Sequence, residues 1–294
     1  MANANISGVG VALVTPFNDD LSIDFESLEK IIKHVISGSA DFLVVLGTTG
    51  ESSLLTQSER NEVITFVREI AAGQLPLVLG YGGICTAQLA EGFKDLDVAG
   101  YSAILSVTPF YVKPSQKGLF EHYTTLAYAS PLPLILYNVP GRTGVNMEPD
   151  TTLSLAEHPN ILGVKEASGK LFQIEEIMMR KTDDFLLFSG DDALTFHLVN
   201  AGANGVISVM ANAFPKEISK IVKSPQDSLS IAMSNHFLLK TVTKAAFADG
   251  NPCGIKYILS RLGLCKNNLR LPLVPVSPAT EEIINKELDK LTGK

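Results

Sequence analysis

Short apolar segments alternate with longer amphipathic segments along most of the chain. The apolar segments are rich in Val, Ile and Leu and lack strict polar alternation, which is typical of strands buried on both faces of a parallel sheet. They lie at residues 9–15, 42–47, 77–82, 103–107, 134–138, 161–165, 186–189 and 205–209. Helical periodicity occurs between them, for example at residues 25–37, 58–72, 87–99 and 117–129.

Eight strand–helix units in succession predict an α/β fold, a (β/α)8 TIM barrel. An open doubly wound sheet is the alternative, and its dinucleotide-binding form is disfavoured because no GxGxxG motif follows the first strand. We expect residues 1–224 to form the barrel. Helical patterns without strands follow, so we expect residues 225–294 to form a C-terminal helical domain with helices at 227–249, 252–262 and 278–291.

Composition excludes several classes of protein. The chain has 294 residues, of which 46% are hydrophobic, so it can bury a large core, and its net charge is −7. An acidic chain is a poor candidate for binding nucleic acid or an anionic membrane surface. No apolar run reaches the ~18 residues of a membrane span, and the N-terminus does not resemble a signal peptide. The three cysteines form no CxxC pair, which favours a reducing, cytoplasmic location.

Catalytic groups of a barrel lie where its strands end, and Lys165 stands at such an end. The segment 161–168 begins apolar and ends polar, and Lys165 occupies the change. Loss of water around an ammonium ion favours the neutral amine, which is nucleophilic. We therefore hypothesise that Lys165 forms a Schiff base with a small keto acid. The alternative is a strand-end lysine whose ammonium reaches solvent, paired with Glu166.

Two further strand ends carry groups suited to that chemistry. The turn Gly-Thr-Thr-Gly at residues 47–50 would bring backbone N–H groups and the hydroxyls of Thr48 and Thr49 close to a carboxylate or phosphate oxygen. The phenol of Tyr137, one strand from Lys165, could transfer protons to and from a carbinolamine and an imine. An ordinary turn and a buried aromatic ring are the structural alternatives.

Charged residues near the other strand ends suggest binding rather than a metal. Arg142 lies in a turn, where its guanidinium could hold a carboxylate by two hydrogen bonds, although a solvated loop arginine is the alternative. The five histidines are scattered without HxH or HExxH spacing, so no metal site is predicted. Asp191 and Asp192 are interpreted as N-terminal capping residues of a helix.

Together these motifs resemble the dihydrodipicolinate synthase branch of the N-acetylneuraminate lyase superfamily. The resemblance rests on GTTGE at residues 47–51, YNVPGRTG at 137–144 and GVKEASG at 163–169. It implies a (β/α)8 barrel with a C-terminal helical part, usually in a homotetramer. It also implies a lyase, without metal or organic cofactor, that condenses pyruvate with L-aspartate-4-semialdehyde in lysine and diaminopimelate synthesis.

The resemblance assigns catalytic roles to four residues. Lys165 matches the Schiff-base lysine, and Tyr137 matches the tyrosine of a proton relay. Thr48 would lie between Tyr137 and Tyr111 in that relay. Tyr111 matches the residue that family members insert into a neighbouring subunit's site. The resemblance implies a homotetramer built as a dimer of dimers, and a dimer is the alternative that the same residues allow.

Three substrate contacts follow in the same way. Thr49 matches the contact to the pyruvate carboxylate, Ile207 an apolar contact near pyruvate, and Arg142 the arginine that receives the semialdehyde's carboxylate. GTTGE rather than GSTGE, together with Arg142, favours the synthase over a lyase acting on N-acetylneuraminate or 2-keto-3-deoxygluconate. A non-catalytic keto-acid sensor and a metal-dependent aldolase are further alternatives.

One departure from the family pattern concerns regulation. Lysine-inhibited relatives typically carry histidines at the positions of Gln57 and Arg60, asparagine at Ile84, glutamate at Gln88 and tyrosine at Phe110. The carboxylate and the amide that would anchor a lysine ammonium are therefore missing, and an unpaired buried charge is costly. We predict weak or absent feedback inhibition by L-lysine.

Overall fold

The barrel is closed. The structure, a computed structural model, describes residues 6–224 and 228–292, and within these ranges eight parallel strands pair in sequence order, with β1 also bonded to β8. The strands are β1 (Gly8–Ala12), β2 (Phe42–Val45), β3 (Leu77–Gly80), β4 (Ala103–Val107), β5 (Leu134–Asn138), β6 (Ile161–Glu166), β7 (Leu186–Ser189) and β8 (Gly205–Ser208). The predicted (β/α)8 barrel is confirmed.

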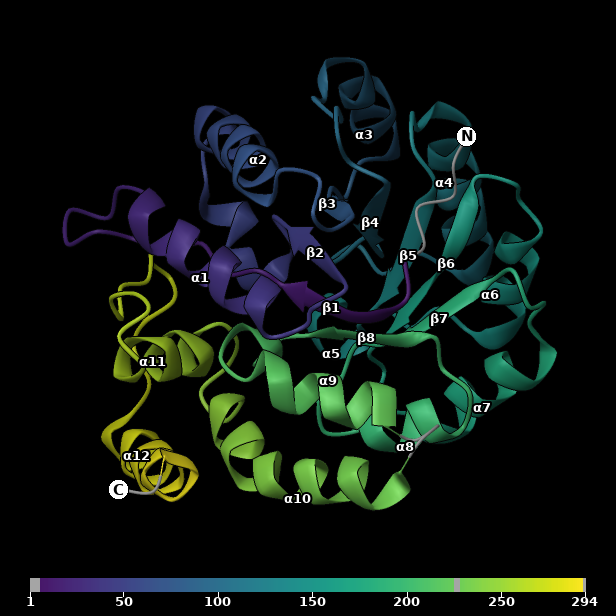
Figure 1. Ribbon diagram of the computed structural model, residues 1–294. Helices are drawn as coiled ribbons and strands as arrows, with labels where there is room; N and C mark the ends of the chain where they lie inside the picture. Colours follow the sequence, from purple (N-terminus) through teal and green to yellow (C-terminus); the bar gives the residue numbers. More distant parts are fainter. Residues whose placement is uncertain (1–5, 225–227, 293–294) are drawn as a thin grey trace.

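Helices surround the barrel, as Figure 1 shows. They are α1 (Phe25–Ser37), α2 (Gln57–Ala71), α3 (Thr86–Gly92), α4 (Gln116–Ala129), α5 (Pro140–Thr143), α6 (Pro149–Ala156), α7 (Leu171–Arg180), α8 (Thr195–Asn200) and α9 (Pro215–Lys223). Short 3-10 turns follow two of the strands, namely η1 (Thr48–Gly50) and η2 (Ser52–Leu54) after β2, and η4 (Met210–Asn212) after β8. Another, η3 (Phe93–Asp95), follows α3.

The first strand is shorter than its apolar run. The run at residues 9–15 predicts a strand to Thr15, yet β1 ends at Ala12. Beyond that point the N–H of Val14 donates to the side-chain oxygen of Asn212, at 3.2 Å, instead of to a neighbouring strand. A side chain from η4 thus accepts the hydrogen bond that a strand carbonyl would otherwise accept. The apolar pattern of the sequence does not reveal this contact.

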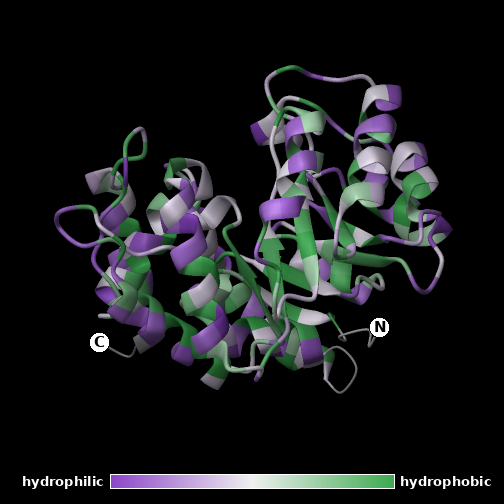
Figure 2. Cartoon of the chain, turned by 90° about the horizontal axis from the view of Figure 1, so that it is seen from above, coloured by the Kyte–Doolittle hydropathy of each residue, from purple (hydrophilic) through white to green (hydrophobic). Residues whose placement is uncertain are grey.

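Side chains pointing into the barrel form a cluster separate from the core between strands and helices. Figure 2 shows the strands as predominantly hydrophobic at the centre of the molecule. The inner cluster comprises Ile6, Ala12, Phe42, Val44, Val78, Ala103, Leu105, Ile135, Tyr137, Val139, Phe188 and Ile207. The barrel is therefore a packed core rather than a pore. Two of the predicted site residues, Tyr137 and Ile207, belong to this inner cluster.

The C-terminal part is helical, as predicted, and packs along one side of the barrel (Figure 1). It consists of α10 (Leu229–Ala246), α11 (Cys253–Arg261) and α12 (Pro278–Thr292). Helix α10 contacts α8 and α9, and both α11 and α12 contact α10. The predicted boundary between residues 224 and 225 adjoins residues 225–227, which lie outside the described residues. We propose that this part is an extension of the barrel, because its buried side chains join the core between strands and helices.

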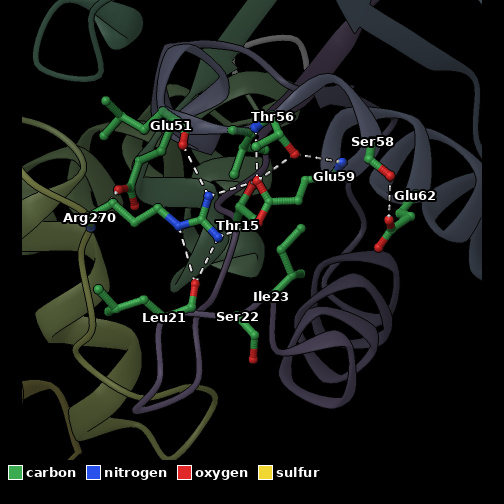
Figure 3. Close-up of polar contacts among 12 residues, drawn as sticks. Thr15, Leu21, Ser22, Ile23, Glu51, Thr56, Ser58, Glu59, Glu62 and Arg270 are labelled. Carbon is green, nitrogen blue, oxygen red and sulfur yellow. Dashed lines mark hydrogen bonds and ion pairs between the residues drawn. The ribbon is translucent and has the colours of Figure 1, made fainter.

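Arg270, in the connection between α11 and α12, ties this extension to the barrel. Figure 3 shows its guanidinium between Leu21 and Glu59. It donates to the backbone oxygens of Leu21, at 2.8 and 3.2 Å, and of Leu54, at 3.0 Å, and forms a fork with the Glu59 carboxylate. The same carboxylate caps α2 by accepting from the N–H of Thr56 at 2.8 Å. Hydrogen bonds from Arg270 and Thr56 lower the pKa of Glu59 from 4.5 to about 2.

We expect Glu59 to make stability depend on pH. A lowered carboxyl pKa contributes stability above the unfolded-state value, near 4.5, and that stability is lost as the pH falls towards 2. Glu59→Gln should therefore lower the free energy of unfolding by up to about 3 kcal/mol at pH 7, and by less at pH 3. Urea unfolding at both pH values measures the difference. Glu26→Gln, at an exposed pair with Lys30, is the control. A deficit that stays constant with pH would contradict the assignment.

Candidate active site

Lys165 lies at the carboxyl end of β6 with its side chain turned into the barrel. It pairs with Tyr137 on β5 and with Phe188 on β7, both members of the inner cluster. Its side chain is buried, and the ammonium nitrogen lies 4.3 Å from the centroid of the Tyr137 ring. The Lys165 amine is therefore a neighbour of the Tyr137 phenol and is flanked by side chains of the apolar inner cluster.

Glu166 does not pair with Lys165, because the next residue of a strand points to the opposite face. Its buried carboxylate accepts from the amides of Asn138, at 3.1 and 3.2 Å, and Gln173, at 3.2 Å, and from the N–H of Ser168, at 2.8 Å. Burial raises the pKa of Glu166, and these hydrogen bonds oppose the rise. The network joins β5, β6 and α7 directly behind Tyr137 and Lys165, and so fixes the strands that carry them.

Gly190, just beyond β7, leaves the space that the Lys165 side chain occupies. A Cβ atom at Gly190 would lie 3.1 Å from Cε of Lys165 and 2.7 Å from Cβ of Ala167. The second distance is shorter than contacts between carbon atoms allow. Any larger residue at this position would therefore displace the lysine or the chain beside it.

The hydroxyl turn after β2 is rigid. The N–H groups of Gly50 and Glu51 donate within the turn, and the Thr15 hydroxyl donates to the Gly50 oxygen at 2.7 Å. The buried Thr49 hydroxyl accepts from the side-chain amide of Asn251 at 2.9 Å. Its own proton therefore remains available for an acceptor such as a carboxylate. Thr48 is exposed.

Arg142 lies in α5 and is an exposed residue. It donates to the backbone oxygen of Asn251 at 3.3 Å. Asn251 thus contacts both residues predicted to bind carboxylates, Thr49 through its side chain and Arg142 through its main chain. The side-chain oxygen of Asn251 is buried and has no hydrogen-bond partner among the described residues.

The predicted relay is only partly assembled within one chain. The side chain of Tyr111 is 86% exposed, and its backbone has φ of 69°, with the N–H donating to the Thr143 oxygen at 3.2 Å. Among the described residues, no hydrogen bond joins the hydroxyls of Thr48, Tyr111 and Tyr137. The structure therefore brings Tyr137 to Lys165 and leaves Tyr111 projecting from the surface.

Residues 5–291 match the Dihydrodipicolinate synthetase family. The chain belongs to this family. It is 46% identical, over all of both chains, to the 4-hydroxy-tetrahydrodipicolinate synthase of Parabacteroides distasonis. The structure resembles that of the chloride-inhibited dihydrodipicolinate synthase of Acinetobacter baumannii complexed with pyruvate, with a TM-score of 0.94, 36% identity and coverage of 98% and 99% of the two chains. It also resembles the lysine-bound enzyme of Cyanidioschyzon merolae, with a TM-score of 0.91, 36% identity and coverage of 96% and 97%.

One sequence-based interpretation of charged residues in this family member was wrong. Asp192 does not cap α8, which begins at Thr195. Its buried carboxylate accepts from the Ser208 hydroxyl and from the N–H groups of Val209, at 2.9 Å, and Met210, at 3.2 Å, and so caps the end of β8. Asp191 accepts from the N–H of Ala193 at 2.9 Å, ahead of the helix. Because Asp191 and Asp192 precede α8 in the sequence, both were expected at its N-terminus. The Asp192 carboxylate points instead to the end of β8.

Neither a membrane-spanning helix nor a metal-binding cluster occurs among the described residues. No helix there is both long and apolar enough to cross a membrane. No three histidine, cysteine, aspartate or glutamate side chains of residues 6–224 and 228–292 gather closely enough to hold a metal ion.

Two residues that shape the site, Asn251 and Gly190, were not predicted from the sequence. Gly190 directly follows a predicted strand, which was an available signal. Asn251 lies between two predicted helices, and its position carried no signal. Its contacts with Thr49 and Arg142 become visible only in the folded chain.

Gly190→Ala should impair adduct formation at Lys165. The added methyl group crowds Cε of the lysine, and small displacements of a reacting group cost about 10²-fold in rate. Borohydride reduction in the presence of pyruvate, followed by peptide mass spectrometry, measures the rate of adduct formation. Gly141→Ala is the control, because a Cβ atom at Gly141 would have no other atom within 4 Å. Equal trapping rates in the two variants would show that Gly190 does not shape the site.

Proposed function

We propose that this chain condenses pyruvate with L-aspartate-4-semialdehyde to give 4-hydroxy-tetrahydrodipicolinate, through a Schiff base on Lys165. The synthase activity, a lyase reaction of lysine and diaminopimelate biosynthesis, is that of its family. The observation that carries the assignment of Lys165 is its buried amine beside the Tyr137 ring at the carboxyl end of the barrel. We place the reaction in the cytoplasm, where the three free thiols stay reduced.

The geometry supports a sequence of proton transfers between Lys165 and Tyr137. The neutral amine adds to the keto carbon of pyruvate, and the carbinolamine loses water to give an iminium ion. Loss of a proton from the methyl group gives an enamine, whose carbon attacks the aldehyde of the second substrate. The product is then still an iminium on Lys165, and attack of the second substrate's amino group on the iminium carbon closes the ring and releases the lysine amine. The Tyr137 phenol, beside the amine, is the group that exchanges protons with these intermediates. Burial of both side chains keeps bulk water from the imine.

Both substrates carry a carboxylate, and the structure supports one binding residue for each. The Thr49 hydroxyl, oriented by Asn251, donates to the pyruvate carboxylate, and Arg142 receives the semialdehyde's carboxylate. Ile207, in the inner cluster with Tyr137, supplies an apolar wall. Asn251 touches both binding residues and so fixes the separation between them, which orients the two substrates for carbon–carbon bond formation.

Replacement of the lysine tests the chemistry. Lys165→Ala should form no borohydride-stable pyruvyl adduct, and the rate of condensation should fall by at least about 10³-fold, because the covalent route is lost. Lys170→Ala, at an exposed lysine five residues on, should behave like the parent. Parallel assays of the parent with N-acetylneuraminate and 2-keto-3-deoxygluconate test the alternative substrates. Retained turnover by Lys165→Ala would refute the mechanism, and preference for a sugar acid would refute the substrate.

We assign Tyr111 to the active site of a neighbouring copy in a homotetramer built as a dimer of dimers. Tyr111 is exposed together with Phe110 and Val112, at 39% and 56%. Three adjacent apolar side chains exposed on a strained loop favour coverage by another chain. Insertion into a second copy would bring the phenol to Thr48, which is itself exposed, and complete the relay to Tyr137.

Mixed oligomers test this arrangement. Lys165→Ala and Tyr111→Phe homo-oligomers should both be nearly inactive. When the two are unfolded and refolded together, the site that retains Lys165 should receive Tyr111 from its neighbour, so activity should return to about a quarter of the parent's. Refolding each variant alone is the control. A mixture no more active than the separate variants would place Tyr111 in its own chain's site.

The positions linked to lysine inhibition support insensitivity. Gln57 bonds to Asn61 at 3.0 Å, and the Arg60 guanidinium donates to the backbone oxygen of Leu55 at 3.0 and 3.2 Å. Ile84 and Gln88 are both exposed, and Ile84 lacks the amide and Gln88 the carboxylate that lysine-inhibited relatives carry at these positions. A positively charged ligand would therefore meet a guanidinium and an apolar side chain.

We expect millimolar L-lysine to change the initial rate less than about twofold, since the ammonium has no carboxylate partner. Rates at limiting and saturating pyruvate measure this. The double substitution Ile84→Asn and Gln88→Glu should increase the sensitivity, whereas Gln74→Glu, on the loop after α2, should not. Strong inhibition of the parent would contradict the prediction.

A further inference from the structure

Glu51 is the last residue of the GTTGE motif, and the roles proposed above leave it unused. Its backbone is left-handed, with φ of 52° and ψ of 31°, a conformation that a residue with a side chain rarely adopts. Its carboxylate is fully buried. Glu51 directly follows the hydroxyl turn, so whatever holds this carboxylate also fixes Thr48 and Thr49.

The partner of Glu51 is Lys256 of α11, 205 residues further along the chain. Both side chains are completely buried and form an ion pair. Lys256 also donates to the backbone oxygen of Asn268 at 2.9 Å and lies 4.0 Å from the centroid of the Phe17 ring. The ammonium thus joins the loop after β1, the turn after β2 and the connection after α11, and no part of it is left for solvent.

Arg270 adds a second link to the same segment. Its backbone N–H donates to the other oxygen of Glu51 at 3.3 Å, while its guanidinium holds Leu54 and Glu59. Figure 3 shows Glu51 and Glu59 on either side of Arg270. The chain from Glu51 to Glu59 is therefore attached at both ends to the C-terminal extension, and the turn that carries Thr48 and Thr49 is held from behind.

We propose that Lys256 is a positioning residue, which through Glu51 holds the hydroxyl turn in the conformation that receives the keto acid's carboxylate. The inference rests on the proposed function, because it takes pyruvate as the ligand of that turn. Lys256 does not touch the reacting atoms. Its loss should therefore weaken the binding of pyruvate more than the binding of the aldehyde, which Arg142 receives.

The test uses the full-length enzyme with the variants Lys256→Met, Glu51→Gln and their combination. Each is assayed for the pyruvate concentration that gives half-maximal borohydride trapping on Lys165, for both KM values and for the melting temperature. In all three variants, we expect the pyruvate concentration that gives half-maximal trapping to rise at least about tenfold. The KM for the semialdehyde should rise less than about threefold. Lys266→Met, which removes an exposed ion pair with Asp19 in the same connection, should match the parent.

The combined variant separates positioning from stability. It contains no unpaired buried charge, so its melting temperature should recover relative to the single variants. Pyruvate binding should stay weak, because the ion pair that holds the turn against α11 is then absent. Recovery of pyruvate binding together with stability would overturn the proposal. If Lys256→Met does not fold, Arg270→Gln, at the partly exposed second link, must still raise the pyruvate requirement by about threefold. A parent that traps no pyruvate on Lys165 would instead refute the proposed function.

Discussion

The register between β5 and β6 is the constraint on which the site depends. It pairs Tyr137 with Lys165 and Asn138 with Glu166. The first pair points into the barrel, and the second points outward, where its side chains are joined by hydrogen bonds. A slip of one residue would exchange the two faces, burying a carboxylate among apolar side chains and turning the amine towards the helices. The outward network therefore secures the positions of Tyr137 and Lys165, so the proposed chemistry depends on hydrogen bonds that take no part in it.

Buried carboxylates recur at the carboxyl ends of the strands. Glu51 follows β2, Glu166 ends β6 and Asp192 follows β7, and each accepts from at least one donor distant in sequence. Burial raises the pKa of Glu166 and of Asp192, and the hydrogen bonds they accept oppose that rise. A short strand end has few backbone partners of its own, because the ladder stops there. A buried acceptor lets such an end gather N–H groups from its surroundings and so gives irregular loops a fixed shape.

The sequence predicts what depends on periodicity and on local motifs. The eight apolar runs give the barrel, and the change from apolar to polar at Lys165 marks that residue as a candidate before any neighbour is known. The contacts that complete the site are not periodic. Asn251 reaches Thr49 across 202 residues, and Lys256 reaches Glu51 across 205. Asp192 was misassigned for the same reason, since its partners lie on the next strand and not on the helix beside it in sequence. These contacts exist only because the closed barrel brings segments distant in sequence next to one another.

The contributions of the barrel and of the extension differ in kind. Strands β5 and β6 carry Tyr137 and Lys165, so the covalent chemistry that we propose depends only on the barrel. Thr49 and Arg142, which we propose bind the two carboxylates, both contact Asn251, which belongs to the extension. Changes in the extension can therefore alter where the substrates sit without disturbing the amine. A barrel of this kind can keep imine chemistry and change its second substrate through the segment that packs on its side, because bond making and substrate placement are held by separate contacts.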